Sequence, residues 1–189
     1  MGHWYFADLA TVGERKDVNA FNRIALTLPV LSDYVIARNG KPVTSVMFED
    51  MVFEKPEPWG KHWWISWYRF QTKIMEPVFD MVQDVSKRFP GLCFRLDWDF
   101  EHEEFGTRLV RVDRVESHEY DAESRREALH RELTGAADDD EEEVCWEIDH
   151  RVVQEFSDRF DKLWRPKVYR ALYSRRRRGE VRSKRSGNR

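Results

Sequence analysis

The sequence predicts an α+β protein: a ferredoxin-like split βαβ sheet with two helices on one face, plus a C-terminal α-helical extension. The apolar periodicity changes along the chain in the order strand, helix, strand, strand, helix, strand. The segment 92–101 alternates apolar and polar residues without interruption. Beyond Tyr120 the composition changes to helix formers. A chain of 189 residues fits one core with an appendage better than two full domains.

The N-terminal segment predicts a strand followed by a helix. Aromatic and branched residues over 4–12 are typical of a strand, and Gly13 marks the turn that ends it. Apolar residues then recur at three- and four-residue spacing over 17–28, which predicts an amphipathic helix that stops before Pro29.

Two further strands are predicted before residue 71. One covers 43–53 and is closed by the pair Pro56 and Pro58. The other covers 63–70, where both alternating faces are largely apolar. A strand that is buried on both faces is usually central in its sheet, so we expect 63–70 in the middle.

The second half of the predicted sheet begins with a helix over 76–89, which Pro90 ends. The strand 92–101 follows, with one apolar face and one face that carries charged residues. This pattern indicates a sheet with one covered and one solvated side. A turn at Gly106 and a partner strand over 109–115 complete the prediction.

The C-terminal region predicts helices. One covers 123–133, and a long one runs from Val144 to about residue 165, where Pro166 separates it from a further apolar helical segment. These helices either cover the second face of the sheet or form an arm for a partner. The predicted domains are a sheet domain over 1–120, a helical extension over 121–174 and a basic, disordered tail over 175–189.

Charge is distributed unevenly along the chain. The net charge is -3, yet the last fifteen residues hold seven Arg and one Lys against one Glu, so the tail carries +7 and the rest -10. The tail is too polar to fold alone, and we weigh two interpretations of it equally: a solvated terminus, and nonspecific contact with nucleic-acid phosphates through Arg175, Arg176, Arg177 and Arg178.

Several short motifs carry a family resemblance over about residues 4–115. They are Trp59-Gly60-Lys61-His62-Trp63, Phe70-Gln71-Thr72, Pro77, Ser86-Lys87-Arg88-Phe89-Pro90 and Gly106. The chain resembles the YubB-type ferredoxin-like proteins of unknown function from plasmids and phages. The resemblance implies the fold and a mobile-element setting, and it supplies no catalytic residues.

The main functional hypothesis is a non-enzymatic binding protein whose acidic body occupies a basic nucleic-acid-binding surface of a host complex, as anti-restriction and anti-CRISPR inhibitors do. The partner is then a host protein or a protein–nucleic-acid complex. The candidate partner-binding residues are Asp97, Asp99, Glu101, Glu103, Glu104, Asp138, Asp139, Asp140, Glu141, Glu142, Glu143, Trp59 and Trp64.

Two alternatives stay open. The first is direct DNA or RNA binding, with the tail arginines on phosphates and the aromatic side chains around 59–68 on bases. The second is a metal-dependent nuclease that uses Asp97 and Asp99, although a charged, solvated strand face is the simpler explanation of these residues.

Other classes of site find little support in the sequence. We predict no cofactor, no catalytic residue and no metal ligand. A zinc site at Cys145 and His150 is disfavoured because these residues lie five apart and diverge by about 140° on a helix. No nucleophile elbow, phosphate loop or dinucleotide motif is present. Without a long apolar run or a leader pattern, we expect no membrane contact and a location in the host cytoplasm.

Overall fold

A computed structural model of the chain describes most of its backbone. The described residues are 4–25, 37–38, 41–42, 49–72, 75–100, 104–112, 114–134 and 141–186. Side chains are described over the same ranges except 25, 37–53, 121, 133–134, 141–146 and 175–186.

The protein is α+β, as predicted, and is built on an antiparallel sheet that is larger than a ferredoxin fold. Six strands follow one another in the order β4-β6-β1-β7-β8-β9, and β5 pairs with β6 outside this path. A separate hairpin joins β2 and β3. The strands are β1 (Tyr5–Gly13), β2 (Ala37–Arg38), β3 (Lys41–Pro42), β4 (Glu49–Phe53), β5 (Glu57–Trp59), β6 (Trp63–Thr72), β7 (Cys93–Phe100), β8 (Glu104–Arg111) and β9 (Arg114–Asp121).

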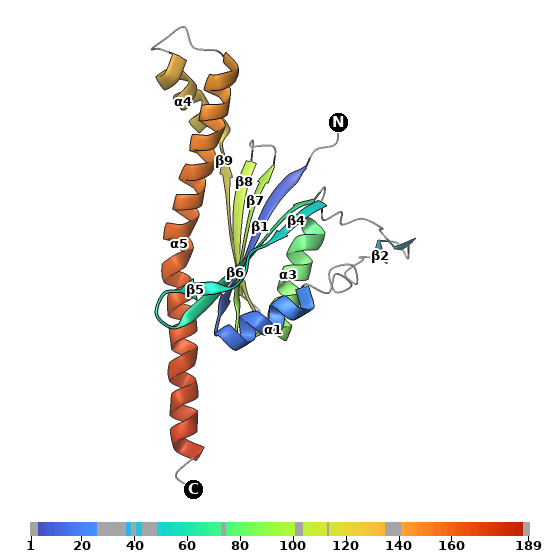
Figure 1. Ribbon diagram of the computed structural model, residues 1–189, viewed down its shortest axis with the longest axis vertical. Helices are drawn as coiled ribbons and strands as arrows, with labels where there is room; N and C mark the ends of the chain where they lie inside the picture. Colours follow the sequence, from blue (N-terminus) through green and yellow to red (C-terminus); the bar gives the residue numbers. More distant parts are fainter. Residues whose placement is uncertain are drawn as a thin grey trace.

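Two helices, α1 (Arg15–Ala25) and α3 (Glu76–Arg88), cover one face of this sheet (Figure 1). Both confirm the predicted helical periodicity, since Val18 and Phe21 of α1 and Val78 and Val82 of α3 enter one buried cluster with the sheet. The part of the first predicted helix beyond residue 25 lies outside the described residues. This cluster forms the first of two cores.

The opposite face is covered by α5 (Glu141–Ser186), and α4 (Glu123–Thr134) packs against α5. Figure 1 shows α5 running the length of the molecule beside the sheet. Ile148, Phe156, Trp164 and Leu172 of α5 pack on this face in a second core. The prediction of a solvated face on strand 92–101 is therefore wrong. Of the two alternatives left open for the C-terminal helices, the structure shows the first: α5 covers the second face of the sheet.

The end of the sheet differs from the prediction. The expected strand over 109–115 spans the end of β8, a turn at Val112 with φ of 52° and the start of β9. Gly106, predicted as a turn, lies inside β8, where a Cβ would meet the Trp98 ring at 2.0 Å. Glycine is thus needed here because the indole ring approaches the backbone closely. In the sequence, a glycine required for such an approach looks the same as a glycine in a turn.

The strand predicted over 43–53 is observed in part. Its end is β4 at the sheet edge, whereas 43–48 lie outside the described residues. The prolines expected to close it flank and enter the short strand β5, with Pro58 opposite Trp64. Proline is compatible with an edge strand because the outward side of the ladder needs no N–H donor. Strand 63–70 is an interior strand, since β6 lies between β1 and β4, but it is one position from the edge and the middle of the sheet is formed by β1 and β7.

Helix α5 passes through two predicted boundaries. Pro166 lies inside it. Pro166 is exposed while Trp164 and Val168 on either side are buried, so packing on the sheet offsets the lost backbone hydrogen bond. The backbone is also helical over 175–186, where we expected a disordered tail. Arginine and lysine are good helix formers and are favourable near a helix C-terminus. Among the described residues, no helix has the length and apolar composition needed to cross a membrane.

Candidate functional site

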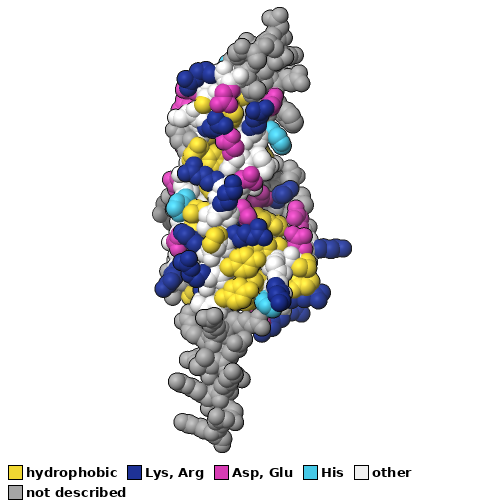
Figure 2. Space-filling view, turned by 90° about the vertical axis from the view of Figure 1, so that its left-hand side faces the viewer, with side chains coloured by type: hydrophobic (Ala, Val, Ile, Leu, Met, Phe, Trp, Pro, Cys, Tyr) yellow, Lys and Arg dark blue, Asp and Glu magenta, His cyan; other side chains and the backbone are white. Residues whose placement is uncertain are grey.

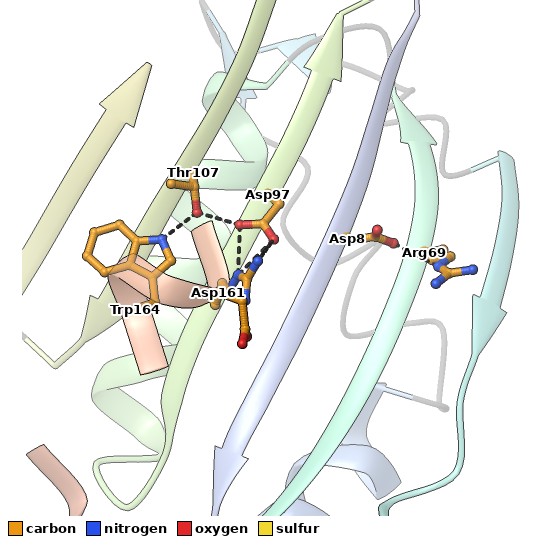
Figure 3. A network of polar contacts seen from close by, with 7 residues as sticks. Asp8, Arg69, Asp97, Thr107, Asp161 and Trp164 are labelled. Carbon is orange, nitrogen blue, oxygen red and sulfur yellow. Dashed lines mark hydrogen bonds and ion pairs between the residues drawn. The ribbon is translucent and has the colours of Figure 1, made fainter. Parts of the chain in front are cut away.

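Asp97, the first predicted partner-binding residue, takes part in a polar network inside the protein (Figure 3). Both carboxylate oxygens accept hydrogen bonds from Arg95 Nε, at 3.0 Å and 2.8 Å, and Thr107 Oγ1 also donates to the carboxylate. Arg95 is 7% exposed. Because a guanidinium and a hydroxyl already occupy the Asp97 oxygens, this carboxylate is a poor ligand for a metal ion or for a basic partner.

Helix α5 closes the network at two positions one turn apart. Arg95 Nη1 contacts Asp161 Oδ1 at 3.1 Å. Trp164 Nε1 donates a hydrogen bond to Thr107 Oγ1 at 2.6 Å. The network therefore joins β7, β8 and α5, and its role is to fix α5 on the sheet.

Asp8 lies beside this network on β1, directly opposite Asp97 in the strand register. It accepts a hydrogen bond from Arg69 Nε at 3.1 Å. Burial raises the pKa of both carboxyls, although the neighbouring arginine opposes the shift in each case. Each carboxylate is paired with its own arginine, Asp8 with Arg69 and Asp97 with Arg95.

An apolar groove of about 390 Å³ opens beside the network, between β1 and α5. Phe6 and Val153, two of the exposed large hydrophobic residues, line it together with Phe156. The Asp8 and Asp97 carboxylates that reach the groove are each paired with an arginine, so we assign them no catalytic role.

An acidic groove of about 850 Å³ lies where the end of β9 meets the starts of α3 and α4. The exposed residues Glu76, Glu104, Glu119 and Glu123 line it, and the rings of Tyr5 and Trp98 lie among them. Burial raises the pKa of Tyr5, and the charges of Glu76 and Glu104 add to this effect. Carboxylates and aromatic rings together favour a cationic group.

Aromatic rings gather at the other end of the molecule, where the β5–β6 hairpin packs on α5. Trp59 stacks on Tyr169, with ring centroids 4.5 Å apart and planes inclined by 14°. Tyr169 in turn lies 6.1 Å from Tyr173 at 22°. The turn residue Gly60 has a φ of 71°, and a Cβ there would lie 2.2 Å from the Tyr169 hydroxyl, so glycine lets the hairpin approach the helix.

Basic side chains and His62 lie near these rings. The Arg165 guanidinium lies 5.9 Å from the Trp59 ring, and His62 contacts Tyr173 edge-on with centroids 6.4 Å apart. Lys61 and Arg170 are exposed next to them in the chain. Figure 2 views this side and shows hydrophobic side chains bordered by lysine, arginine and histidine. We call this surface the basic–aromatic face; it consists of Trp59, Lys61, His62, Arg165, Tyr169, Arg170 and Tyr173.

The charge of α5 changes sign along its length. From residue 141 to residue 161 the helix holds eight Asp or Glu and two Arg. From Lys162 to the end of the chain there are twelve Lys or Arg and one acid, Glu180. The basic–aromatic face lies at the beginning of this basic half.

The structure separates the predicted site residues. Asp97 belongs to the internal network, and Asp99 lies on the same half-buried strand face. Glu104 lines the acidic groove. Trp59 is on the basic–aromatic face, whereas Trp64 lies on the opposite side of β6 under Arg15, whose guanidinium is 4.3 Å from the ring.

The remaining predicted residues fall where the structure gives no side chains. Glu101, Glu103 and Asp138–Asp140 lie outside the described residues. The segments 141–143 and 175–178 belong to α5, but their side chains are not among those described. Within the described residues, no three His, Cys, Asp or Glu side chains come together as a metal site requires.

Sequence reasoning missed that Tyr169 and Tyr173 stack in line with Trp59. The pattern placed them on an apolar surface, yet Tyr173 is 40% exposed. The spacing of Arg165, Tyr169 and Tyr173 at four-residue intervals was the available signal, because residues four apart share one helix face.

Comparison with known proteins adds little. No protein-family model matches the chain, and no curated protein matches it. A crystal structure of aldoxime dehydratase is similar over 56% of this chain and 31% of that chain, with 6% sequence identity and a TM-score of 0.32. The chain thus spans about a third of that protein's length, and a likeness at this TM-score carries no argument about fold or activity.

Proposed function

We propose that this protein acts by binding nucleic acid along the basic half of α5, without catalysis. The observation that carries the proposal is the basic–aromatic face, where Trp59, Tyr169 and Tyr173 lie among cationic residues. Rings of this kind contact bases, and lysine or arginine contacts phosphates.

The charge of α5 supports this proposal. Lys162, Arg165 and Arg170 are exposed, and the same helix continues into Arg175–Arg178. A stretch with twelve basic residues and one acid attracts a polyanion and releases its counterions. Most acidic residues of α5 lie in its other half. Asp161, at the boundary, contacts Arg165 Nη1 at 3.5 Å, and Glu180 is the one acid beyond it in the sequence.

Fluorescence anisotropy with labelled DNA and RNA oligonucleotides over a series of salt concentrations tests the proposal. We expect binding at low salt, and the logarithm of the binding constant should fall linearly with the logarithm of the salt concentration. Replacing Arg175–Arg178 with glutamine removes up to four phosphate contacts, which reduces the slope by about 3 at about 0.7 per contact on a single strand.

A matched control replaces four exposed basic residues of α1, α3 and α4, Arg23, Lys87, Arg88 and Arg131, with glutamine. The control keeps the same total charge as the test variant, so it should retain the salt slope of the unmodified protein. Absence of binding at low salt, or equal effects of the two variants, contradicts the proposal.

We also propose that β1, α1, β4, β6, α3 and β7 form a ferredoxin-like split βαβ unit to which β8 and β9 are added. Support comes from the strand order β4-β6-β1-β7. The connection through α1 joins β1 to β4 across β6, and the connection through α3 joins β6 to β7 across β1. Truncation after Glu101 removes β8, β9 and α5, so the sheet face that α5 covers needs polar substitutions in the shortened chain. With these substitutions, the remaining unit should fold by itself. Kinship with the YubB-type family and a cytoplasmic location stay predictions.

A second candidate function is the inhibitor that occupies a basic surface of a host complex. The acidic groove favours it, because Glu104 and three further glutamates converge there with aromatic rings. We expect a labelled arginine-rich peptide to bind this groove, and Glu104→Gln with Glu119→Gln to weaken binding. Glu14→Gln with Glu57→Gln, exposed elsewhere, is the control; equal losses in both variants contradict this candidate.

A further inference from the structure

We infer that the basic–aromatic face is built for single-stranded nucleic acid, with a base stacked on Tyr173 and phosphates following α5 toward Arg175–Arg178. This inference rests on the proposed function and specifies its ligand. It is carried by the rings, by the width of the surface around them and by the charge beside them.

The rings lie as an ordered row. Trp59 and Tyr169 are nearly parallel at 14°, and Tyr173 continues the row at 22°. Tyr173 is the most open of the three, with 40% of its surface exposed. An exposed ring in line with stacked rings offers a base a π face, and base–aromatic stacking tolerates any base.

The Tyr173 ring is held in position before a ligand arrives. Trp63, buried in the second core, contacts it edge-on with centroids 5.7 Å apart and an interplanar angle of 85°. His62 contacts it from the turn that precedes Trp63, at 81°. A ring fixed in this way loses little conformational freedom when a base binds, which favours affinity.

The surroundings of the rings argue against a duplex. A major groove is about 12 Å wide and admits one helix of about 10–12 Å diameter. At Tyr169 and Tyr173, α5 is packed against the β5–β6 hairpin through Trp59 and Trp63. Helix and hairpin together are too wide for that groove, and the π faces of paired bases are covered by their neighbours. A single strand presents its bases freely.

Cations lie beside the row. The Arg165 guanidinium is near Trp59, and Lys61 and Arg170 are exposed beside Trp59 and Tyr169 in the chain. No acid occurs in the sequence between Lys162 and residue 179. A strand whose bases lie on the rings therefore meets positive charge along its phosphates.

The test compares three labelled ligands of about 12 nucleotides, within the size of common single-strand sites. They are an oligodeoxythymidine strand, a strand of the same length made of abasic spacers, and a duplex. The full-length protein should bind the thymidine strand tightest. Losing the bases should weaken binding by about 5- to 150-fold for each stacked base.

Two substitutions at one position separate stacking from charge. Tyr173→Leu should weaken thymidine binding by about 5-fold or more while leaving the salt slope unchanged, because no phosphate contact is removed. Tyr173→Phe keeps the ring and should retain the affinity within about twofold. Circular dichroism and thermal unfolding check that both variants are folded.

The outcomes distinguish this inference from the proposed function. If the unmodified protein binds none of the three ligands at low salt, the proposed function fails and takes the inference with it. If the duplex or the abasic strand binds as tightly as the thymidine strand, the single-strand inference is overturned while nucleic-acid binding stands. The ligand comparison needs no variant, so a misfolded substitution leaves it intact.

Discussion

Trp164 Nε1 donates a hydrogen bond to Thr107 Oγ1 at 2.6 Å, and this contact fixes the long helix to the sheet. The Thr107 hydroxyl donates in turn to Asp97, whose partner Arg95 reaches back to Asp161 on the same helix. Trp164 is 1% exposed, so its N–H has no water as a substitute. These polar contacts, together with the apolar residues of α5 in the second core, orient α5 and with it the basic–aromatic face.

The Trp164–Thr107 contact should be measurable by a double-mutant cycle. Trp164→Phe and Thr107→Val should show a coupling of about 1 kcal/mol in the free energy of unfolding, the usual net value of a hydrogen bond. Urea denaturation of the four proteins gives this number. Trp63→Phe combined with Thr107→Val serves as control, because Trp63 on β6 shares no partner with Thr107 and the two effects should add.

Removing one partner of the Arg95–Asp97 pair should lower the free energy of unfolding more than replacing both partners with apolar residues. Asp97→Ala leaves a buried guanidinium with Asp161 as its remaining partner and should lower the free energy of unfolding by about 3 kcal/mol. Replacing both residues, Arg95→Met with Asp97→Val, should cost less than Asp97→Ala alone. A double variant that is less stable than the single one in chemical denaturation argues against this account.

Asp8 should make stability depend on pH. Burial is the main cause of its raised pKa, with the Asp97 charge adding and Arg69 opposing. The folded protein then keeps the Asp8 proton to a higher pH than the unfolded chain, so this carboxyl lowers stability as pH rises from about 3.9 through the raised pKa. Asp8→Asn removes the ionisation. Its stability relative to the unmodified protein should increase over that interval and stay level above it; a constant difference across pH would falsify the assignment.

Gly106 should tolerate no side chain while Trp98 is present. A Cβ would lie 2.0 Å from the indole ring, so Gly106→Ala should cost about 1–3 kcal/mol in the free energy of unfolding. In a Trp98→Leu background the added cost should largely disappear. Thermal and urea unfolding of both pairs provide the measurement, and an equal cost in both backgrounds means that the ring is not the cause.

Local periodicity predicted most of the fold. The alternation over 92–101 and the helical stripes over 17–28 and 76–89 appear as β7, α1 and α3, because each pattern matches the repeat of the element that buries it. The β8–β9 hairpin was missed. Its turn at Val112 carries no glycine or proline, and the glycine that suggested a turn, Gly106, accommodates a ring from the neighbouring strand.

The candidate site was predicted less well than the fold. The sequence singled out Trp59 and the tail arginines, but not the tyrosines that stack beside that tryptophan. Tyr169 lies more than a hundred residues from Trp59 in the chain, and no local pattern relates the two. Asp97 was selected as an exposed acid because the alternation over 92–101 indicated a solvated strand face, whereas Asp97 and Arg95 neutralise each other under α5.

The sequence by itself determined the α+β class, the long C-terminal helical region and the opposite charges of its two halves, since these depend on composition and on spacing along one segment. The tertiary structure decided that the charged strand face is buried, that α5 continues through Pro166, and that Trp59 meets Tyr169 and Tyr173. Each of these results comes from packing between segments distant in the chain. Whether a residue is buried or paired depends on contacts between separate segments. The sequence pattern shows which residues can make such contacts but not which of them meet.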